Sequence, residues 1–218
     1  MSSVTQLIIL AAIALYLFFR LRNVLGTRDG FEGGSKMQRG ITIDQPGRVV
    51  TPVEPEIDPE ILKHVERESD AAKALMAMSQ VDQSFSIVEF IDGAGKAYEW
   101  ILTSFAAGDV DDLEQYLSED VFRTFKQTVE ERDNSKKVHT EFVALLDKSI
   151  RDAKFDSDSR QAEIEIEFQS ELLSYVLDEE GTVVEGSNTR AKRQRDVWVF
   201  ARQMDSNDPN WVLIATGT

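Results

Sequence analysis

The first pattern along the chain is an uninterrupted apolar run near its N-terminus. From Leu7 to Phe19 every residue is Leu, Ile, Ala, Tyr or Phe, and Arg20 and Arg22 close the run. Together with the residues just before it, the run reaches the roughly 17–25 residues that a membrane-spanning helix requires. No basic residue precedes it and no polar cleavage region follows it. We therefore expect residues 1–25 to form an uncleaved transmembrane anchor, the alternative being a cleaved signal peptide.

Two segments without a continuous apolar stripe follow the anchor. Residues 26–57 are rich in glycine and proline and have no apolar period, which is typical of a flexible tether. Asp58-Pro59-Glu60 then has the form of a helix start. We expect a helix from there to about Gln80, so that residues 58–81 form an amphipathic helical arm. This arm either packs on the following domain or is a mobile contact for a partner or the bilayer.

The clearest helix signal begins at Ser86. Ser86 and Glu89 have the spacing of a capping box, and apolar residues then recur three and four positions apart as far as Phe105. Gly93 and Gly95 lie inside this helix, where each glycine costs roughly 1 kcal/mol relative to alanine. We therefore expect another part of the chain to pack closely against both glycines.

Two shorter helices are expected after the long one. Gly108 suits the residue that follows the end of a helix. The next helix begins at Asp109 and ends near Leu117, and a further one begins at Ser118 with its apolar residues on one side. Asn134 is expected to end that helix.

From about Val138 the apolar period changes to alternate residues. Residues 162–168 alternate between apolar and acidic, which predicts an amphipathic strand with one face in solvent. The apolar phase then shifts, which predicts a bulge near residues 170–172. Further strands are expected at 142–150, 197–201 and 211–215. Helices followed by antiparallel strands predict an α+β fold, with the helices packed on one face of a curved antiparallel sheet.

The distribution of charge along the chain predicts how the anchor is oriented in the membrane. The chain carries a net charge of −15, yet six basic and three acidic residues lie between Phe19 and residue 52. Basic residues beside a span tend to stay in the cytoplasm, so we expect the N-terminus outside and the C-terminal domain in the cytoplasm. Arg20, Arg22 and Arg28 would then lie near anionic lipid. The acidic remainder of the chain disfavours nucleic acid as a ligand, and the lack of cysteine excludes disulfides.

Candidates for acid–base chemistry are few. His64 and His139 lie in polar surroundings and are expected in solvent. Asp92 and Glu99 flank the apolar stripe of the long helix. A buried Asp92 would have a raised pKa and could accept a proton, whereas at the helix boundary it would be an ordinary surface carboxylate. The acidic residues of 162–168 are expected to form a solvated strand face. The sequence predicts no catalytic residue, no metal site and no cofactor.

A series of short motifs runs from Phe90 to Trp211. These are Phe90-Ile91-Asp92-Gly93-Ala94, Ala97-Tyr98-Glu99, Ser104–Asp109, Leu113, Tyr116–Val121, Phe125, Glu131-Arg132, Gly186, Asp196–Arg202 and Asp208–Trp211. Their ordered combination resembles the Tim44-like domain, which is shared by the membrane anchor of the mitochondrial import motor and by bacterial TimA proteins. The resemblance covers about three-fifths of the chain, and we place the domain at 82–218. A mitochondrial member would be expected to begin with an Arg- and Ser-rich transit peptide, so we expect a bacterial inner-membrane protein.

The resemblance implies a cone-like fold, similar to nuclear transport factor two, with an apolar cavity between helices and sheet. That cavity would bind an acyl chain or an apolar segment of a partner. The residues expected to line it are Tyr98, Ile101, Leu102, Phe122, Phe125, Trp198 and Phe200.

These observations lead us to expect a non-enzymatic, membrane-tethered adaptor or scaffold. It would bind a protein partner or lipid at the membrane, in protein translocation or membrane-protein assembly. The partner could be a chaperone or part of the translocation machinery, and the sequence does not name it. One alternative is a carrier or enzyme that uses the cavity, with Asp92 or Glu99 as base. The other is a structural protein that self-associates through residues 61–78.

Overall fold

The computed structural model describes residues 57–132 and 137–217. Its elements in chain order are the 3₁₀ helix η1 (Ile61–Lys63), helices α2 (Asp70–Val81) and α3 (Ile87–Ala107), the 3₁₀ helix η2 (Asp111–Tyr116), helix α4 (Glu119–Glu130), and strands β1 (Lys137–Phe155), β2 (Gln161–Leu177), β3 (Val183–Gln203) and β4 (Val212–Gly217). Among these elements, no helix is long and apolar enough to cross a membrane. The expected anchor and the basic strip after it lie outside the described residues, as does all of the expected tether except Ile57.

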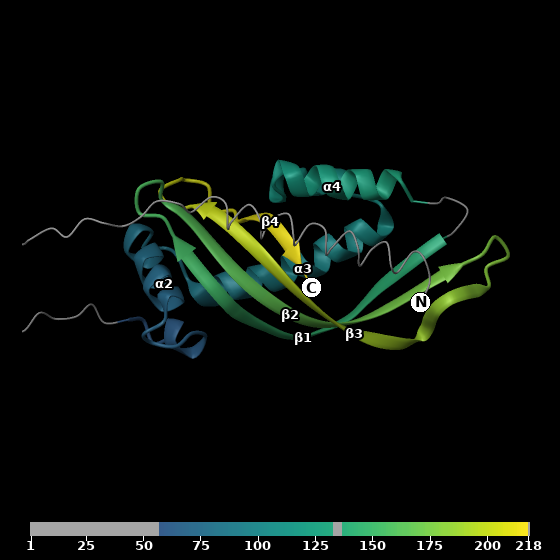
Figure 1. The fold of residues 1–218 in the computed structure, drawn as a ribbon, viewed down its shortest axis with the longest axis horizontal. Coiled ribbons are helices and arrows are strands. Elements are labelled where there is room, and N and C mark those ends of the chain that lie inside the picture. The colour runs from purple at the N-terminus through teal and green to yellow at the C-terminus, as the bar shows by residue number, and fades with distance from the viewer. Residues whose placement is uncertain (1–56, 133–136, 218) are drawn as a thin grey trace, which may run out of the picture.

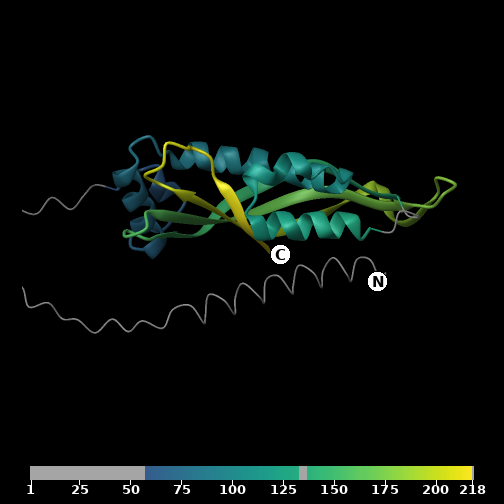
Figure 2. The ribbon, with the colours of Figure 1, turned by 90° about the horizontal axis from the view of Figure 1, so that it is seen from above.

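The four strands form one antiparallel sheet in the order β1-β2-β3-β4. The sheet is curved and the helices pack against it (Figures 1 and 2). α2 lies at one end of the sheet, α3 runs along it, and α4 lies farther from the sheet than α3 in the view of Figure 1. This arrangement confirms the predicted α+β class. It follows from the alternation in the strands, because apolar residues on one face of a sheet must be covered by other elements.

Local signals define both ends of α3. The Ser86 hydroxyl accepts a hydrogen bond from the backbone N–H of Glu89, as the capping box predicted. At the other end Gly108 adopts a left-handed conformation with φ of 82° and ends the helix. Phe85 and Phe90 both pack against Trp211, at ring-centroid distances of 5.9 and 4.7 Å. The beginning of α3 is therefore held against the segment that leads into β4.

Only one of the two glycines inside α3 has a close neighbour. A Cβ added at Gly95 would lie 3.2 Å from Cδ2 of Leu145 and 3.4 Å from Cδ of Lys148. A Cβ added at Gly93 would meet nothing within 4 Å. The expectation of close packing is confirmed for Gly95 and wrong for Gly93, which lies on the exposed side of the helix.

The single helix expected from Asp58 to Gln80 is wrong. The chain forms η1, leaves the helical conformation, and begins α2 after Ser69, whose hydroxyl accepts from the N–H of Ala72. The intervening residues are mostly charged and offer no apolar face to bury, so packing does not favour a helix there. Leu75 and Met78 of α2 are fully buried, and burying each such side chain contributes roughly 1.5–3 kcal/mol. The sequence left open whether this arm packs on the domain or is a mobile contact, and α2 packs on the domain.

An ion pair joins the end of α2 to the sheet. Nη2 of Arg202 on β3 lies 2.6 Å from Oδ2 of Asp82, and their side chains are only 9% and 14% exposed. Nε of Arg202 also donates to the carbonyl of Asp208. The pair therefore connects α2 with β3 and with the loop that precedes β4.

The phase shift expected in β2 is wrong. Alternate residues of β2 stay buried from Ala162 to Leu172, so one face of the strand remains continuous. The expected bulge near residues 170–172 is present, but its extra residues belong to the neighbouring strands. β1 has one extra residue opposite residues 171–172 and another opposite residues 169–170, and in β3 Lys192 pairs with Leu172 whereas Ser187 pairs with Ser174. The extra residues of β3 lie between Ser187 and Lys192, next to Gly186, which has φ of 77° and where a side chain would overlap the backbone of Ser174. A glycine is needed at that position for both reasons.

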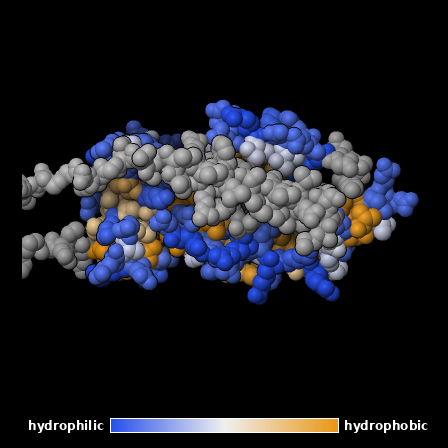
Figure 3. All heavy atoms as spheres, viewed as in Figure 1, coloured by the Kyte–Doolittle hydropathy of each residue, from blue (hydrophilic) through white to orange (hydrophobic). Residues whose placement is uncertain are grey.

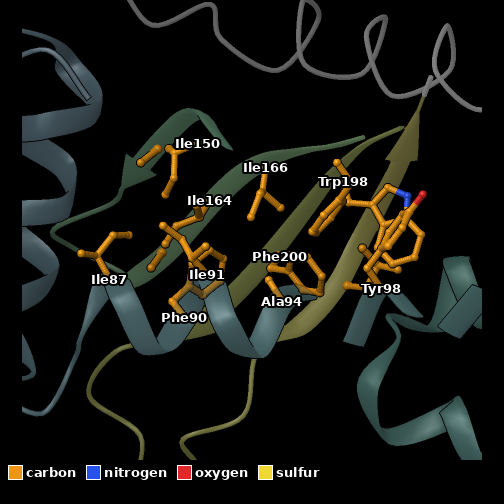
Figure 4. Close-up of a cluster of buried hydrophobic side chains, with 14 of the residues drawn as sticks. Ile87, Phe90, Ile91, Ala94, Tyr98, Ile150, Ile164, Ile166, Trp198 and Phe200 are labelled. Carbon is orange, nitrogen blue, oxygen red and sulfur yellow. The ribbon is translucent and has the colours of Figure 1, made fainter. Parts of the chain in front are cut away.

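The core lies between α3 and the sheet. Figure 4 shows side chains of α3 pointing toward those of β1, β2 and β3, with Tyr98 and Trp198 side by side. α4 is joined to this body at its start, where Ser118 caps the helix and its N–H donates to the carbonyl of Leu213 on β4. In the view of Figure 3 the outer surface of α4 is mostly hydrophilic, which agrees with the predicted amphipathic helix.

Candidate functional site

Tyr98 lies at the centre of the aromatic core. It is fully buried, and its ring stacks on Phe168 at a centroid distance of 4.3 Å and tilts against Trp198 at 4.8 Å. Phe142 approaches its edge at 6.3 Å. The apolar part of Tyr98 is therefore packed on several sides by rings from three strands.

The hydroxyl of Tyr98 belongs to a buried polar network. It donates to Oδ2 of Asp196 at 2.5 Å and lies 2.9 Å from Oγ of Ser170. Nε2 of Gln194 donates to both oxygens of the same carboxylate, at 3.0 and 2.8 Å. Asp196 and Ser170 are both buried. Buried polar groups are tolerated when each has a hydrogen-bond partner, and this network meets that condition.

Burial changes the ionisation of both members of this pair. It raises the pKa of the Asp196 carboxyl, and hydrogen bonds from Tyr98 and Gln194 lower it again in part. Burial, the nearby charge of Asp196 and the hydrogen bond to it raise the pKa of the Tyr98 hydroxyl. Tyr98 therefore remains a phenol and acts as donor. The hydrogen bonds of this network join α3 to β2 and β3, and the polar atoms of its members point at one another.

A second aromatic group joins α4 to the end of α3. The rings of Phe105 and Phe125 lie 4.7 Å apart, and the Arg132 guanidinium lies 4.7 Å from the Phe105 ring centroid. The same guanidinium donates to the carbonyls of Phe105 and Ala106, so it caps α3. These side chains are only partly buried. We call this surface the α3–α4 apolar face, and its members are Leu102, Phe105, Phe122, Phe125 and Val129.

Two shallow pockets lined by described residues lie at the other end of the molecule. One, of about 520 Å³, is formed by residues 62–67 around η1. The other, of about 480 Å³, has an apolar floor and a polar rim. Its lining residues are His64, Val88, Ile91, Asp92, Leu145, Leu146, Asp147 and Lys148. Neither pocket includes any of the seven residues expected to line a cavity.

Asp92 is a surface carboxylate. Its side chain is exposed, and Oδ1 lies 2.5 Å from Nζ of Lys148 on β1. The hydrogen bond and charge of Lys148 lower the pKa of Asp92, which is the opposite of what a buried general base requires. Glu99 is also exposed. Of the two possibilities for Asp92, the boundary carboxylate is the one observed.

Residues 71–218 match the family model described as the Tim44-like domain. The chain belongs to the Tim44-like domain family. The match covers about two-thirds of the chain, begins inside α2 and includes all four strands. No curated protein matches the chain. The family shown here is the one that the ordered motifs of the sequence resembled.

In this Tim44-like chain the seven expected site residues fall into two groups. Tyr98, Ile101, Trp198 and Phe200 are in the closed core. Leu102, Phe122 and Phe125 belong to the partly buried α3–α4 apolar face. That all seven line one cavity stays a prediction. Only the second group has side-chain surface that a ligand could reach without displacing the core.

Two buried acidic residues of the Tim44-like domain were not predicted to be buried from the sequence. Asp196 received no role, although it alternates with Trp198 and Phe200 and so shares their face. Glu167 was expected in solvent, but its side chain is 8% exposed and lies 2.6 Å from Arg151 and 2.7 Å from Arg195. Burial alone would raise the pKa of Glu167, and the two arginines lower it below its ordinary value.

The described part of the domain offers no site for a metal ion. No group of three or more His, Asp or Glu side chains there is arranged to hold one. His139 stacks on Tyr175 at 5.1 Å and is exposed. His64 lies at the edge of both shallow pockets. Neither histidine is near the buried carboxylate of Asp196.

Proposed function

We propose that this protein is a non-enzymatic, membrane-tethered adaptor or scaffold. Membership of the Tim44-like family suggests a membrane-associated role related to protein translocation. Beyond that, we propose that the domain binds an apolar segment of a protein partner at the membrane, in translocation or membrane-protein assembly. The cone-like fold and cavity that the resemblance implies would serve this purpose.

The observation that carries this proposal is the α3–α4 apolar face. α4 is tied to the body at its beginning by Ser118 and near its end by Arg132. Between these two attachments, aromatic side chains stay partly accessible although the core beside them is closed. Partly exposed aromatic side chains beside a rigid body are typical of binding surfaces, because they provide apolar area with little loss of conformational entropy.

The absence of usable acid–base geometry among the described residues supports a binding role over an enzymatic one. Asp92 is exposed and ion-paired. Asp196 is buried, and its oxygens accept from Tyr98 and Gln194. A carrier of a small apolar ligand remains the second candidate. The same α3–α4 apolar face favours it, since an acyl chain could occupy that surface.

Membrane attachment is the second part of the proposal. We propose that residues 1–25 anchor the chain in the bacterial inner membrane, with the N-terminus outside and the domain in the cytoplasm. Arg20, Arg22 and Arg28 would contact anionic lipid, because cationic side chains beside a span are attracted to it. The acidic body would be repelled from the same lipid and would stand away from the bilayer.

Photo-crosslinking in cells tests the proposed partner. The probe replaces Phe122 in the full-length, membrane-bound protein, because Phe122 is partly accessible whereas Tyr98 is fully buried. A matched probe at Gln127, which is exposed on the same helix, is the control. A discrete protein adduct from position 122 and not from 127 supports the adaptor. Lipid adducts alone would support the carrier, and equal adducts from both positions would contradict a site on this face.

A further inference from the structure

The outer half of β3 has a free edge. β4 pairs with β3 only from Val197 to Ala201, so no described strand is bonded to that edge between Val183 and Asp196. In Figure 1 this half of β3 continues toward the β2–β3 hairpin, well away from α4. In an antiparallel strand, alternate residues direct N–H and C=O away from the paired neighbour. The edge therefore offers backbone donors and acceptors to an added strand.

The regular part of this edge is Lys192–Asp196. These residues pair with Phe168–Leu172 of β2 without a register shift. They continue directly from the segment of β3 that β4 covers. Beyond them the strand is interrupted, because the Ser187 hydroxyl accepts from the N–H groups of Thr189 and Arg190. An added strand would thus lie in line with β4 and end near Lys192.

The same stretch is basic in a chain with a net charge of −15. Residues 189–195 contain four basic side chains and no acidic one. The basic residues are Arg190, Lys192, Arg193 and Arg195. Arg193 and Arg195 lie on one face of the strand and pair with Glu171 and Glu167 of β2. Within the part of the chain that the structure describes, Arg190 and Lys192 have no ion-pair partner.

We propose that Lys192–Asp196 of β3 docks an extended acidic segment of a partner protein, which adds to the sheet as a strand in line with β4. Backbone hydrogen bonds to the free edge would hold the segment. Acidic side chains at alternate positions would lie beside Arg193 and Arg195 on one face, and the intervening side chains would lie beside Lys192 and Gln194 on the other. Opposite charges on neighbouring strands stabilise such pairs. This proposal does not depend on the α3–α4 apolar face.

Charge distinguishes this occupant from two others. Pairing with the same edge of a second copy would bring Lys192, Arg193 and Arg195 close to the same basic residues of that copy, and like charges on neighbouring strands are destabilising. A flat anionic membrane could meet the basic side chains on only one face of the strand. It would also leave the backbone groups of the edge without partners of fixed geometry. An acidic strand pairs with Arg193 and Arg195 on one face and with the backbone groups of the edge at the same time.

Fluorescence anisotropy tests the proposal with the full-length protein in a neutral detergent. The probe is a short fluorescein-labelled peptide of alternating glutamate and valine. The comparison peptide has the same sequence with alternate amide nitrogens methylated, so that its charge is unchanged and its backbone donors are blocked. The test variant is Lys192→Glu/Arg193→Glu. The control variant is Arg123→Glu/Lys126→Glu, which reverses two exposed charges on α4.

The expected result is saturable binding of the first peptide, weakened about tenfold by the test variant and unchanged by the control, since Arg193→Glu turns an attractive charge pair into a repulsive one and Lys192→Glu adds a like charge at the same edge. Blocking the backbone donors is expected to abolish binding, and added salt to weaken it. Equal binding of both peptides would overturn the proposal, as would equal effects of the two variants. Binding to phosphatidylglycerol vesicles that depends on Lys192 and Arg193, without peptide binding, would overturn it in favour of a lipid surface.

Discussion

The hydroxyl of Tyr98 on α3 donates to the carboxylate of Asp196 on β3 at 2.5 Å, across a sequence separation of 98 residues. This one bond joins the long helix to the strand that carries both the core residues Trp198 and Phe200 and the basic edge beyond them. Because both groups are buried, each depends on the other for hydrogen bonding. The pair is therefore a structural link between the core and the outer half of β3.

Removal of the Tyr98 hydroxyl is expected to destabilise the fold. Tyr98→Phe keeps the ring but deprives the buried Asp196 carboxylate of one donor, which costs about 1–3 kcal/mol of unfolding free energy. Urea unfolding of the full-length protein in mild detergent measures this change. Tyr175→Phe is the matched control, because Tyr175 is only partly buried and its ring stacks on an exposed histidine. Equal effects of the two variants would contradict a special role for the Tyr98 hydroxyl.

Stability is expected to depend on pH through Asp196. Because burial raises the pKa of this carboxyl, the folded state holds its proton more tightly than the unfolded state. The contribution of Asp196 to stability therefore falls as pH rises from the ordinary pKa of an aspartate to the raised pKa, and is constant above it. Asp196→Asn should remove this dependence, so the variant gains stability relative to wild type over that interval. Unfolding curves across acidic pH measure the difference, and a relative loss over the interval would contradict the assignment.

The ion pair between Asp82 and Arg202 is expected to hold α2 on the sheet. Asp82→Ala leaves the largely buried guanidinium of Arg202 without its carboxylate, which costs about 3 kcal/mol. The loss should be seen as faster hydrogen exchange in α2 than in α3. Asp70→Ala breaks the exposed pair with Lys73 and is the control, since exposed pairs contribute little. Unchanged exchange in α2 of the Asp82 variant would show that apolar packing alone holds the helix.

Core and surface positions among the expected site residues should respond differently to a charge. Trp198→Asp places a carboxylate in the closed core and is expected to unfold the domain. Phe125→Asp lies on the partly buried α3–α4 apolar face and should leave a cooperative thermal transition, while it removes the adduct formed by the probe at position 122. Circular dichroism separates these outcomes. Retention of the fold by Trp198→Asp would indicate that this side chain lines an open cavity.

Much of the fold was predictable because its signals are local. The cap at Ser86, the left-handed Gly108 and the alternation from Ala162 to Phe168 each depend on residues that are close in sequence. The helix expected over 58–80 was wrong, since its charged middle had no partner surface. The phase shift expected in β2 was also wrong, because the extra residues belong to β1 and β3 and are visible only once the strands are paired.

The candidate site was less predictable than the fold. Aromatic residues were expected to form the site, but the sequence could not separate Tyr98, which is closed in the core, from Phe122, which is partly accessible. Alternation with Trp198 could have indicated the inward direction of Asp196. Nothing in the sequence indicated that Glu167 would lie between two arginines, since Arg151 and Arg195 come from different strands.

The sequence by itself determined the order and type of most elements, the α+β class and the resemblance to the Tim44-like family. Hydrogen bonds and apolar periods within a few residues of one another carry that information. Only the tertiary structure decided which carboxylates are buried, which aromatic side chains stay accessible and which edge of β3 is left uncovered by the described strands. Those properties depend on contacts between segments distant in the chain, and Tyr98 and Asp196 meet only after helix and sheet have packed.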